Sequence, residues 1–274
     1  MTGWFLGVLA VTWSFWGASA LLSADGSEAS AALARWTFCA GGLAPLLMAL
    51  LAVQRDLVRL ERRNFWRRVL DVRRMRVADW VRAVLPAPLV LLAAVLIAGF
   101  VDGEVTAGFV APASWLLTPV FLLLFGPLPE EIAWRGWALD RLQQTESALF
   151  ASVLLAAVWA LWHLPLFFID GTYQHGLGVG TPAFWLFMLS LLPQSIVLTW
   201  VFNSARRAVA APIVLHWLIN LTGELVTAPL LTEVLLLMVW GLFATALVAL
   251  HGPERLCSDP AARAQLERRM KQLD

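Results

Sequence analysis

Residues 83–101 read AVLPAPLVLLAAVLIAGFV and contain no charged side chain. A helix of about 20 predominantly apolar residues spans the hydrocarbon core of a bilayer, so this stretch has the length and composition of a membrane span. Similar apolar stretches recur on both sides of it and leave no segment for a separate soluble domain. The sequence therefore predicts a single all-α, polytopic transmembrane domain over residues 1–274.

The composition supports this class. The chain is 60% hydrophobic and 14% charged, with a mean hydropathy of +0.73, whereas soluble domains are about 25% charged. Its two cysteines, Cys39 and Cys257, are too few for a disulfide framework or a thiolate metal site. We expect about eight spans, and they cover residues 4–22, 33–53, 83–101, 113–134, 147–169, 182–203, 208–226 and 230–250.

The distribution of basic residues predicts the orientation. Loops rich in arginine face the cytoplasm, and the segment 54–82 carries ten arginines: Arg55, Arg59, Arg62, Arg63, Arg67, Arg68, Arg73, Arg74, Arg76 and Arg82. This basic cytoplasmic loop, together with an even number of spans, predicts cytoplasmic N- and C-termini and a cytoplasmic tail over residues 251–274. Trp66, Leu70 and Trp80 interleave with the arginines, as in a helix on an anionic lipid surface. The ordinary alternative is an orientation signal alone.

Three predicted spans carry polar residues that are costly inside a bilayer. They contain PLPEEIAWR at residues 127–135, WALWH at 159–163 and HWLIN at 216–220. An ionisable side chain within a span costs about 2.5–3.5 kcal/mol on insertion scales, so each one indicates a functional site. The fold is therefore predicted to enclose an intramembrane polar site.

Spacing suggests roles within these segments. Glu131 and Arg135 are four residues apart with the acid first, the favourable order for a helical ion pair. Glu130 faces another direction, stays free and is the better candidate for a general base. Pro127 and Pro129 lie just before it and are expected to bend the helix towards the bundle interior.

The third segment places His216 and Asn220 on one helix face, where both can act on a single target. At a rise of about 1.5 Å per residue, Glu130, His163, His216 and Asn220 can reach one layer of the membrane. A single intramembrane histidine is more often a partner in an interhelical hydrogen bond. A pair of glutamates also suits the proton relay of a transporter.

The motifs Glu130-Glu131-x-x-x-Arg135, Trp159-x-x-x-His163 and His216-x-x-x-Asn220 resemble those of the CAAX protease and bacteriocin-processing family. The resemblance covers about residues 113–225 as a catalytic core. It implies that Glu130 activates a water, that His163 is a second catalytic group, and that His216 and Asn220 form the oxyanion or water-positioning pair. Glu131 and Arg135 would be supporting residues.

Two features depart from the family pattern. Trp159 stands where the family usually has Phe; this keeps an aromatic wall, so we expect a minor effect. The segment 203–208, NSARRA, lacks the Gly-Ser character associated with the family. The second departure bears on substrate handling more than on chemistry.

The mechanism stays open at this stage. Glu130, His163 and His216 suit Zn²⁺ by ligand type, in which case the metal would lower the pKa of a bound water. The resemblance also allows a metal-free mechanism in which the buried glutamate deprotonates water unaided.

The sequence predicts an intramembrane protease, of metallo- or glutamate type, acting on membrane-tethered peptides. Its substrates would be prenylated CAAX-type or bacteriocin-like peptides. The protein would lie in the lipid bilayer, and nucleic acid is not an expected partner. Arginine and alanine abound beside a single lysine, which suggests a bacterial cell membrane and favours peptide maturation or bacteriocin self-immunity. The alternatives are a non-proteolytic immunity or scaffold protein and a proton-coupled transporter.

Overall fold

The computed structural model describes residues 1–274 apart from residues 26, 106–107, 110–116 and 271–274. Nearly all of the described chain is helical, which confirms the predicted all-α fold. The strands β1 (Gly108–Phe109) and β2 (Val226–Thr227) form a short antiparallel pair beside the helices.

Among the described residues, six helical stretches are long and apolar enough to cross a membrane, so the protein is a polytopic integral membrane protein. Two of them are compound: α4 (Val77–Val84) continues into α5 (Pro86–Asp102), and α9 (Ala148–His163) continues into the 3₁₀ helix η3 (Leu164–Phe168). The other four are α1 (Thr2–Ala24), α2 (Glu28–Asp56), α11 (Pro182–Ser204) and α13 (Leu230–His251).

The count of eight spans is not confirmed, because two of the expected spans have another form. The start of the fourth, residues 113–116, lies outside the described residues. Its remainder is divided into α6 (Leu117–Phe125) and α7 (Pro127–Glu131), which continues as the π-helix η2 (Ile132–Leu139) and α8 (Asp140–Leu142). The seventh is α12 (Ala210–Leu225), only 16 residues long. A divided helix and a short one thus carry two of the three polar motifs.

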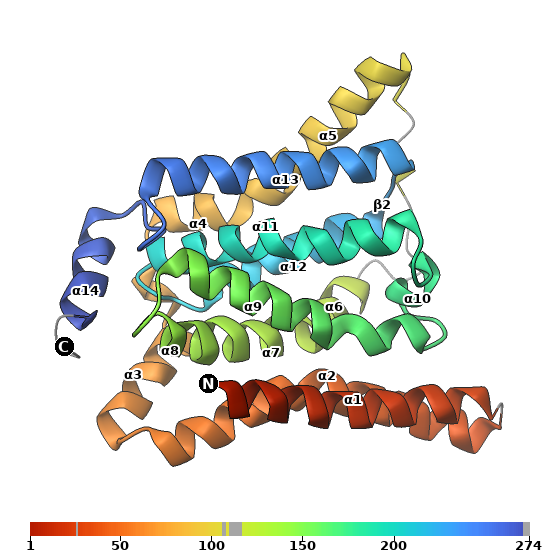
Figure 1. Ribbon diagram of the computed structural model, residues 1–274, viewed down its shortest axis with the longest axis horizontal. Helices are drawn as coiled ribbons and strands as arrows, with labels where there is room; N and C mark the ends of the chain where they lie inside the picture. The colour runs from red at the N-terminus through yellow and green to blue at the C-terminus, as the bar shows by residue number, and fades with distance from the viewer. Residues whose placement is uncertain (26, 106–107, 110–116, 271–274) are drawn as a thin grey trace.

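The helices are stacked in layers (Figure 1). The pair α1 and α2 forms one outer layer, and α13 with α5 forms the opposite one. Between them lie α9, α11, α12, α7 and η2, and the short helix α10 (Tyr173–Leu177) follows η3 at one end. The three motifs therefore occupy the interior of the stack rather than its outer layers.

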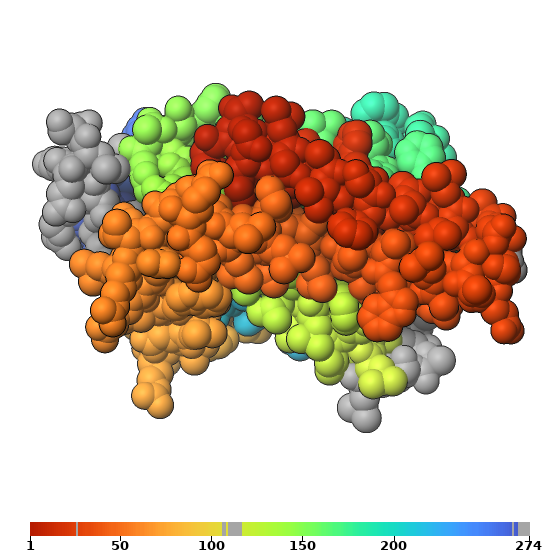
Figure 2. Space-filling view, turned by 90° about the horizontal axis from the view of Figure 1, so that it is seen from below, coloured from red at the N-terminus to blue at the C-terminus, as the bar shows by residue number. Residues whose placement is uncertain are grey.

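The outer pair α1 and α2, together with α3 (Arg59–Leu70), covers most of one face of the molecule (Figure 2). Trp16 fixes this layer, because its indole donates to the Phe38 carbonyl at 2.9 Å. A Cβ on Gly41 would come within 2.4 Å of the Trp16 ring, so glycine permits this close approach of the two helices. Trp162 of α9 donates to Thr12 of α1 at 2.9 Å and joins the layer to the interior.

The basic segment is folded against one end of the bundle. This end holds α3, the 3₁₀ helix η1 (Val72–Arg74) and α14 (Pro260–Met270), and the start of α1 lies there too (Figure 1). Asp140, at the end of η2, pairs with Arg68 of α3 and with Arg207 of the turn before α12. Residues 271–274 of the predicted tail lie outside the described residues.

The turn between α11 and α12 explains one departure from the family pattern. Arg206 and Arg207 have φ values of 54° and 62°, a left-handed conformation that glycine adopts without steric cost. Contacts offset that cost: Arg207 pairs with Asp140, and the Arg206 carbonyl accepts from Arg74 at 3.1 Å. The missing glycine is thus accommodated by local pairing.

Candidate active site

The first motif lies at a break in its helix. α6 ends at Phe125, Gly126 follows in a non-helical conformation, and α7 begins with Pro127. Proline suits a first helical position because its missing N–H would have no intrahelical partner there. The break resets the helix direction and buries Glu130 and Glu131 in the bundle. The π-helix η2 begins directly after them, and such irregular turns are frequent at functional sites.

Glu131 is the centre of a fully buried ion network. Its Oε1 accepts from Arg135 Nη1 at 2.8 Å, which confirms the predicted pair. The same oxygen accepts from His216 Nδ1 at 2.8 Å, across from α12. A carboxylate on Nδ1 fixes the ring orientation and leaves Nε2 for other chemistry. The network therefore joins the first motif to the third.

Arg135 extends this network into the neighbouring helices. Its guanidinium lies 5.1 Å from the centroid of the Trp159 ring and donates to Ser195 Oγ at 3.4 Å. Ser195 donates to the Ser152 carbonyl at 2.9 Å. The buried charge of Arg135 is thus spread over contacts with α7, α9 and α11, as a stable buried ion pair requires.

Glu130 has a different environment from Glu131. It is 5% exposed, and its Oε2 accepts from the Trp159 indole Nε1 at 2.8 Å. As predicted, Glu130 makes no ion pair among the described residues, but Trp159 donates a hydrogen bond to it from α9. A phenylalanine ring has no N–H to donate, so the prediction that Trp159 is a minor change stays to be tested.

A narrow space beside Gly126 separates Glu130 from Asn220. A Cβ placed on Gly126 would lie 3.8 Å from Glu130 Oε1 and 3.6 Å from Asn220 Nδ2. It would also approach the Leu122 carbonyl to 3.0 Å. Because this position has no side chain, a carboxylate and an amide donor from different helices approach the same point, with a gap too tight for a methyl group. Asn220 and Glu130 thus face a common point, although His216, one turn earlier, is engaged by Glu131.

His163 lies at the end of α9 with both motifs nearby. Its Nδ1 donates to the Trp159 carbonyl at 2.8 Å, so Nε2 carries the free lone pair of the neutral ring. Aromatic rings surround it: the Trp162 and Phe187 centroids lie 4.8 and 5.3 Å from the His163 centroid. The Trp159 ring packs edge-on against His216 at 5.1 Å and also borders His163 at 5.5 Å.

The structure thus gathers residues from all three motifs around Trp159. Sequence reasoning missed three contributors: the indole donor of Trp159, the space at Gly126 and the link through Ser195. The departure of Trp159 from the family pattern was the one available signal, and it was visible in the sequence.

The proposed zinc ligands were Glu130, His163 and His216. Within the described part of the chain, no three His, Cys, Asp or Glu side chains are grouped as a metal site requires. The Nδ1 atoms of both histidines donate to oxygen acceptors, which leaves each Nε2 lone pair available, and Glu130 Oε2 accepts from an indole. The three side chains are thus not gathered as a metal centre, and metal use stays a prediction.

Two comparisons place this site among known proteins. The family model described as type II CAAX prenyl endopeptidase Rce1-like matches residues 112–222, a region that contains all three motifs. The chain is 28% identical over 217 residues to CAAX prenyl protease 2 of Methanococcus maripaludis, covering 77% of this chain and 79% of that protein. The family resemblance predicted from the motifs is therefore confirmed: this integral membrane protein is similar to the type II CAAX prenyl endopeptidases, and the matched region contains its buried polar site.

Proposed function

We propose that this chain is an intramembrane endopeptidase that hydrolyses peptide bonds in membrane-tethered substrates. The observation that carries the proposal is that the Glu130 carboxylate and the Asn220 amide, from different helices, approach the same point beside Gly126. A water and a peptide carbonyl that entered between these two groups would meet a base on one side and a hydrogen-bond donor on the other. The similarity to CAAX prenyl endopeptidases supports this reading.

Glu130 is the general base. Its Oε2 is held by Trp159, while Oε1 borders the space at Gly126. Glu131 is less suited to this role, because its Oε1 accepts from Arg135 and His216. Its Oε2 has no hydrogen-bond partner among the described residues, but the side chain is fully buried. Of two adjacent buried acids, only Glu130 has a neutral donor in place of basic partners, which leaves its carboxylate available to take a proton.

Asn220 and His216 stabilise the developing negative charge. Asn220 Nδ2 borders the same space and can donate to a carbonyl oxygen that becomes an oxyanion. His216 is oriented by Glu131, and its Nε2 can supply a second donor when protonated. We assign His163 the role of a second catalytic group beside Glu130. Its Nε2 atom would exchange protons with the reacting groups.

The reaction is a balanced hydrolysis. Glu130 removes a proton from water, and the water oxygen bonds to the peptide carbonyl carbon as the C=O electrons move onto oxygen. The tetrahedral intermediate then collapses, the C–N bond breaks, and the proton on Glu130 passes to the departing amine. The products are a carboxylic acid and an amine, and no step requires a metal.

The substrates reach the site from the lipid. α6 runs up to Gly126, and none of its side chains is buried; Leu117 is 70% exposed. An exposed apolar helix beside Gly126 suits a substrate peptide that carries its own hydrophobic anchor. The name of the methanogen relative points to a prenylated peptide, and a bacteriocin-like peptide is the alternative. The basic end of the bundle would face the cytoplasm of a bacterial cell, with both termini there.

The test is peptide cleavage by the purified full-length protein in liposomes. A farnesylated CAAX-type peptide is compared with the same peptide lacking the lipid and with a bacteriocin-like precursor, each with and without chelator. Glu130→Gln is the site variant, and Glu224→Gln, on the same bundle but outside the motifs, is the matched control. Asn220→Ala serves as the oxyanion variant.

We expect wild type and Glu224→Gln to cleave the anchored peptide. Glu130→Gln should lose activity by about 10²–10⁴-fold, the usual contribution of a general base, and Asn220→Ala by about 10²–10³-fold. Inactivation by chelator would replace the metal-free mechanism with a zinc-dependent one. A folded wild type that cleaves none of the peptides would contradict the protease reading and favour a scaffold or immunity protein. Proton-coupled transport abolished by Glu130→Gln would favour the transporter.

A further inference from the structure

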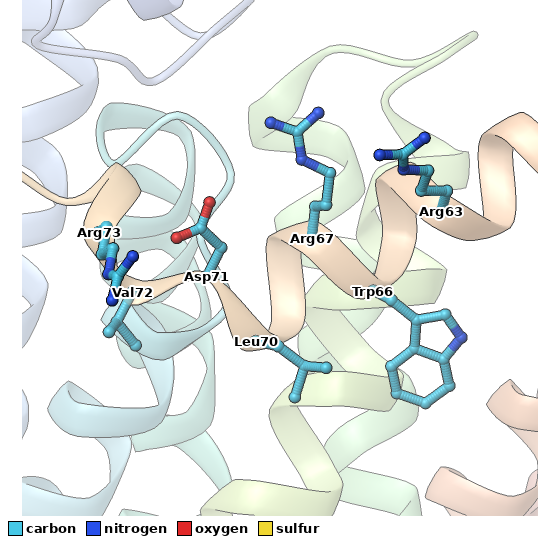
Figure 3. A pocket seen from close by; sticks show the side chains of 7 residues that line it. All are labelled: Arg63, Trp66, Arg67, Leu70, Asp71, Val72 and Arg73. Carbon is cyan, nitrogen blue, oxygen red and sulfur yellow. The ribbon is translucent and has the colours of Figure 1, made fainter.

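A hollow on the basic segment lies outside the proposed catalytic site. It has a volume of about 610 Å³ and opens at the surface of α3 and η1 (Figure 3). Four of its residues follow the spacing of a single helix face, and three belong to the turn into η1. The lining consists of Arg63, Trp66, Arg67, Leu70, Asp71, Val72 and Arg73.

The hollow has a charged side and an apolar side. In Figure 3, Arg63 and Arg67 extend to the same side of α3, whereas Trp66 and Leu70 point to the other. Leu70 is 71% exposed, although it is a large aliphatic side chain. A helix with arginines along one edge and exposed apolar residues along the other is typical of the membrane interface.

The arginines of this hollow have no anionic partner among the described residues, and the same holds for Arg59, Arg62 and Arg74 of the same segment. Within the described residues, Arg63, Arg67 and Arg73 make no hydrogen bond or ion pair. By contrast, Arg68 on the opposite face pairs with Asp140, and Arg76 pairs with Asp259. Structural arginines of the segment are therefore paired, and three exposed ones converge on the hollow.

We propose that this hollow binds the headgroup of an anionic phospholipid. Arg63 and Arg67 bind the phosphate oxygens, because guanidinium groups match phosphate geometry, and Arg73 adds positive charge. Asp71 is the single acid of the lining and accepts from a headgroup hydroxyl, which suits a glycerol headgroup. The net charge of the lining remains positive, so a singly charged anionic lipid is complementary to it.

The apolar side distinguishes a lipid from free phosphate. Trp66, Leu70 and Val72 offer an indole and two aliphatic surfaces next to the arginines, and tryptophan favours the headgroup level of a bilayer. An inorganic ion would leave these side chains in water. A phospholipid places its glycerol backbone and upper acyl chains against them, so the two sides of the hollow are used together.

Binding here is connected to the rest of the fold through Arg68. This residue, on the α3 face away from the hollow, donates to the Gly136 carbonyl at 3.3 Å and pairs with Asp140. Both partners belong to the helical run that begins with the two glutamates. A lipid that binds the folded protein also stabilises it, because binding to the native state alone shifts the unfolding equilibrium.

The experiment is a lipid titration of the purified full-length protein in detergent, followed by native mass spectrometry. Phosphatidylglycerol is compared with phosphatidylcholine, which has the same acyl chains but no net charge. The site variant is Arg63→Gln with Arg67→Gln. The matched control is Arg55→Gln with Arg59→Gln, which removes the same charge from the same segment outside the hollow. A third arm adds inorganic phosphate as competitor, and Trp66→Ala tests the apolar side.

We expect wild type to prefer phosphatidylglycerol and the site variant to lose about thirtyfold in that affinity, the effect of removing two arginines from an anionic lipid surface. The control should keep most of the preference, and Trp66→Ala should weaken both lipids. Equal losses of phosphatidylglycerol affinity in the site variant and the control would overturn the proposal. They would mean that the lipid is attracted only by the overall positive charge of the segment. Displacement of lipid by millimolar inorganic phosphate, with Trp66→Ala unchanged, would assign the hollow to free phosphate instead.

Discussion

A buried carboxylate paired with two basic side chains lies at each end of the π-helix η2, but the two ends have different roles. At its start Glu131 accepts from Arg135 and His216, and at its end Asp140 pairs with Arg68 and Arg207. Each of these carboxylates joins η2 to other parts of the fold. The start of η2 differs from its end because a second acid, Glu130, lies beside Glu131. The Glu130 carboxylate accepts from a neutral indole and not from an arginine.

The comparison separates structural from chemical carboxylates. A buried acid that accepts from two basic groups holds both of them, and its removal leaves buried positive charge without a partner. A buried acid with one neutral donor can accept a proton from substrate water without breaking an ion pair. The two ends of η2 should therefore respond differently to the same substitution.

The largest effect is expected at Glu131. Glu131→Gln removes the anion between Arg135 and His216, so we expect a loss of about 3–5 kcal/mol in unfolding free energy and at least a hundredfold loss of activity. Thermal unfolding in detergent and peptide cleavage measure the two quantities. Glu130→Gln is the control, because it should lose activity with little change in stability. Equal stabilities for the two variants would contradict the comparison.

Asp140→Asn should act on stability alone. It removes the partner of two arginines at the far end of η2, so we expect a loss of about 3 kcal/mol or more. Cleavage per folded molecule should stay within about twofold, since Asp140 lies outside the three motifs. Asp56→Asn, which breaks the exposed pair with Arg55, should cost less than about 1 kcal/mol. Loss of turnover in folded Asp140→Asn would show that the end of η2 takes part in the chemistry.

Trp159→Phe tests the neutral donor at Glu130. A hydrogen bond to a charged group contributes about 1.5–3 kcal/mol, so the turnover rate should fall about tenfold or more. Trp134→Phe is the matched control, since the Trp134 indole N–H has no hydrogen-bond partner among the described residues. The same loss of turnover in both variants would argue against a role for the indole donor.

The smallest effect is expected in the turn that supplies Arg207. Arg206→Gly removes a left-handed non-glycine residue and should raise the unfolding free energy by about 1 kcal/mol. Its pair with Asp259 is long, at 3.7 Å, and Asp259 keeps its closer partner Arg76 at 2.6 Å. Arg207→Gly relieves the same strain but also removes a partner of Asp140, and it should destabilise the protein. Stabilisation by both variants would mean that the Arg207 pair contributes nothing.

The sequence predicted the helical membrane fold and the residues of the site, because both follow from local patterns. Long apolar stretches fixed most spans, and the i, i+4 spacing correctly paired Glu131 with Arg135. The eight-span count was not confirmed, since length and apolarity cannot reveal a break at Gly126 or a short helix inside the bundle. Spacing along one helix also could not predict that His216 bonds to Glu131 on another.

The contact made by Trp159 illustrates the same limit. Its size and aromaticity could be compared with phenylalanine in the sequence, but the value of its N–H depends on where the chain turns after Gly126. The Trp159 indole reaches Glu130 because α9 and α7 pack side by side, and this packing cannot be seen in the sequence.

The short helix α6 has a consequence for how the protein opens. Its nine residues bury no side chain, and its Pro119 carbonyl accepts the Trp217 indole of α12 at 2.9 Å. Local stability follows buried contacts, so amide hydrogens of α6 should exchange with solvent or lipid-associated water sooner than those of η2, where all eight residues are buried. The segment beside the two glutamates can then unfold while the charged network stays closed. Gly126 thus separates two cooperative units: α6, which would open, and the segment from α7 to η2, which carries the catalytic glutamate.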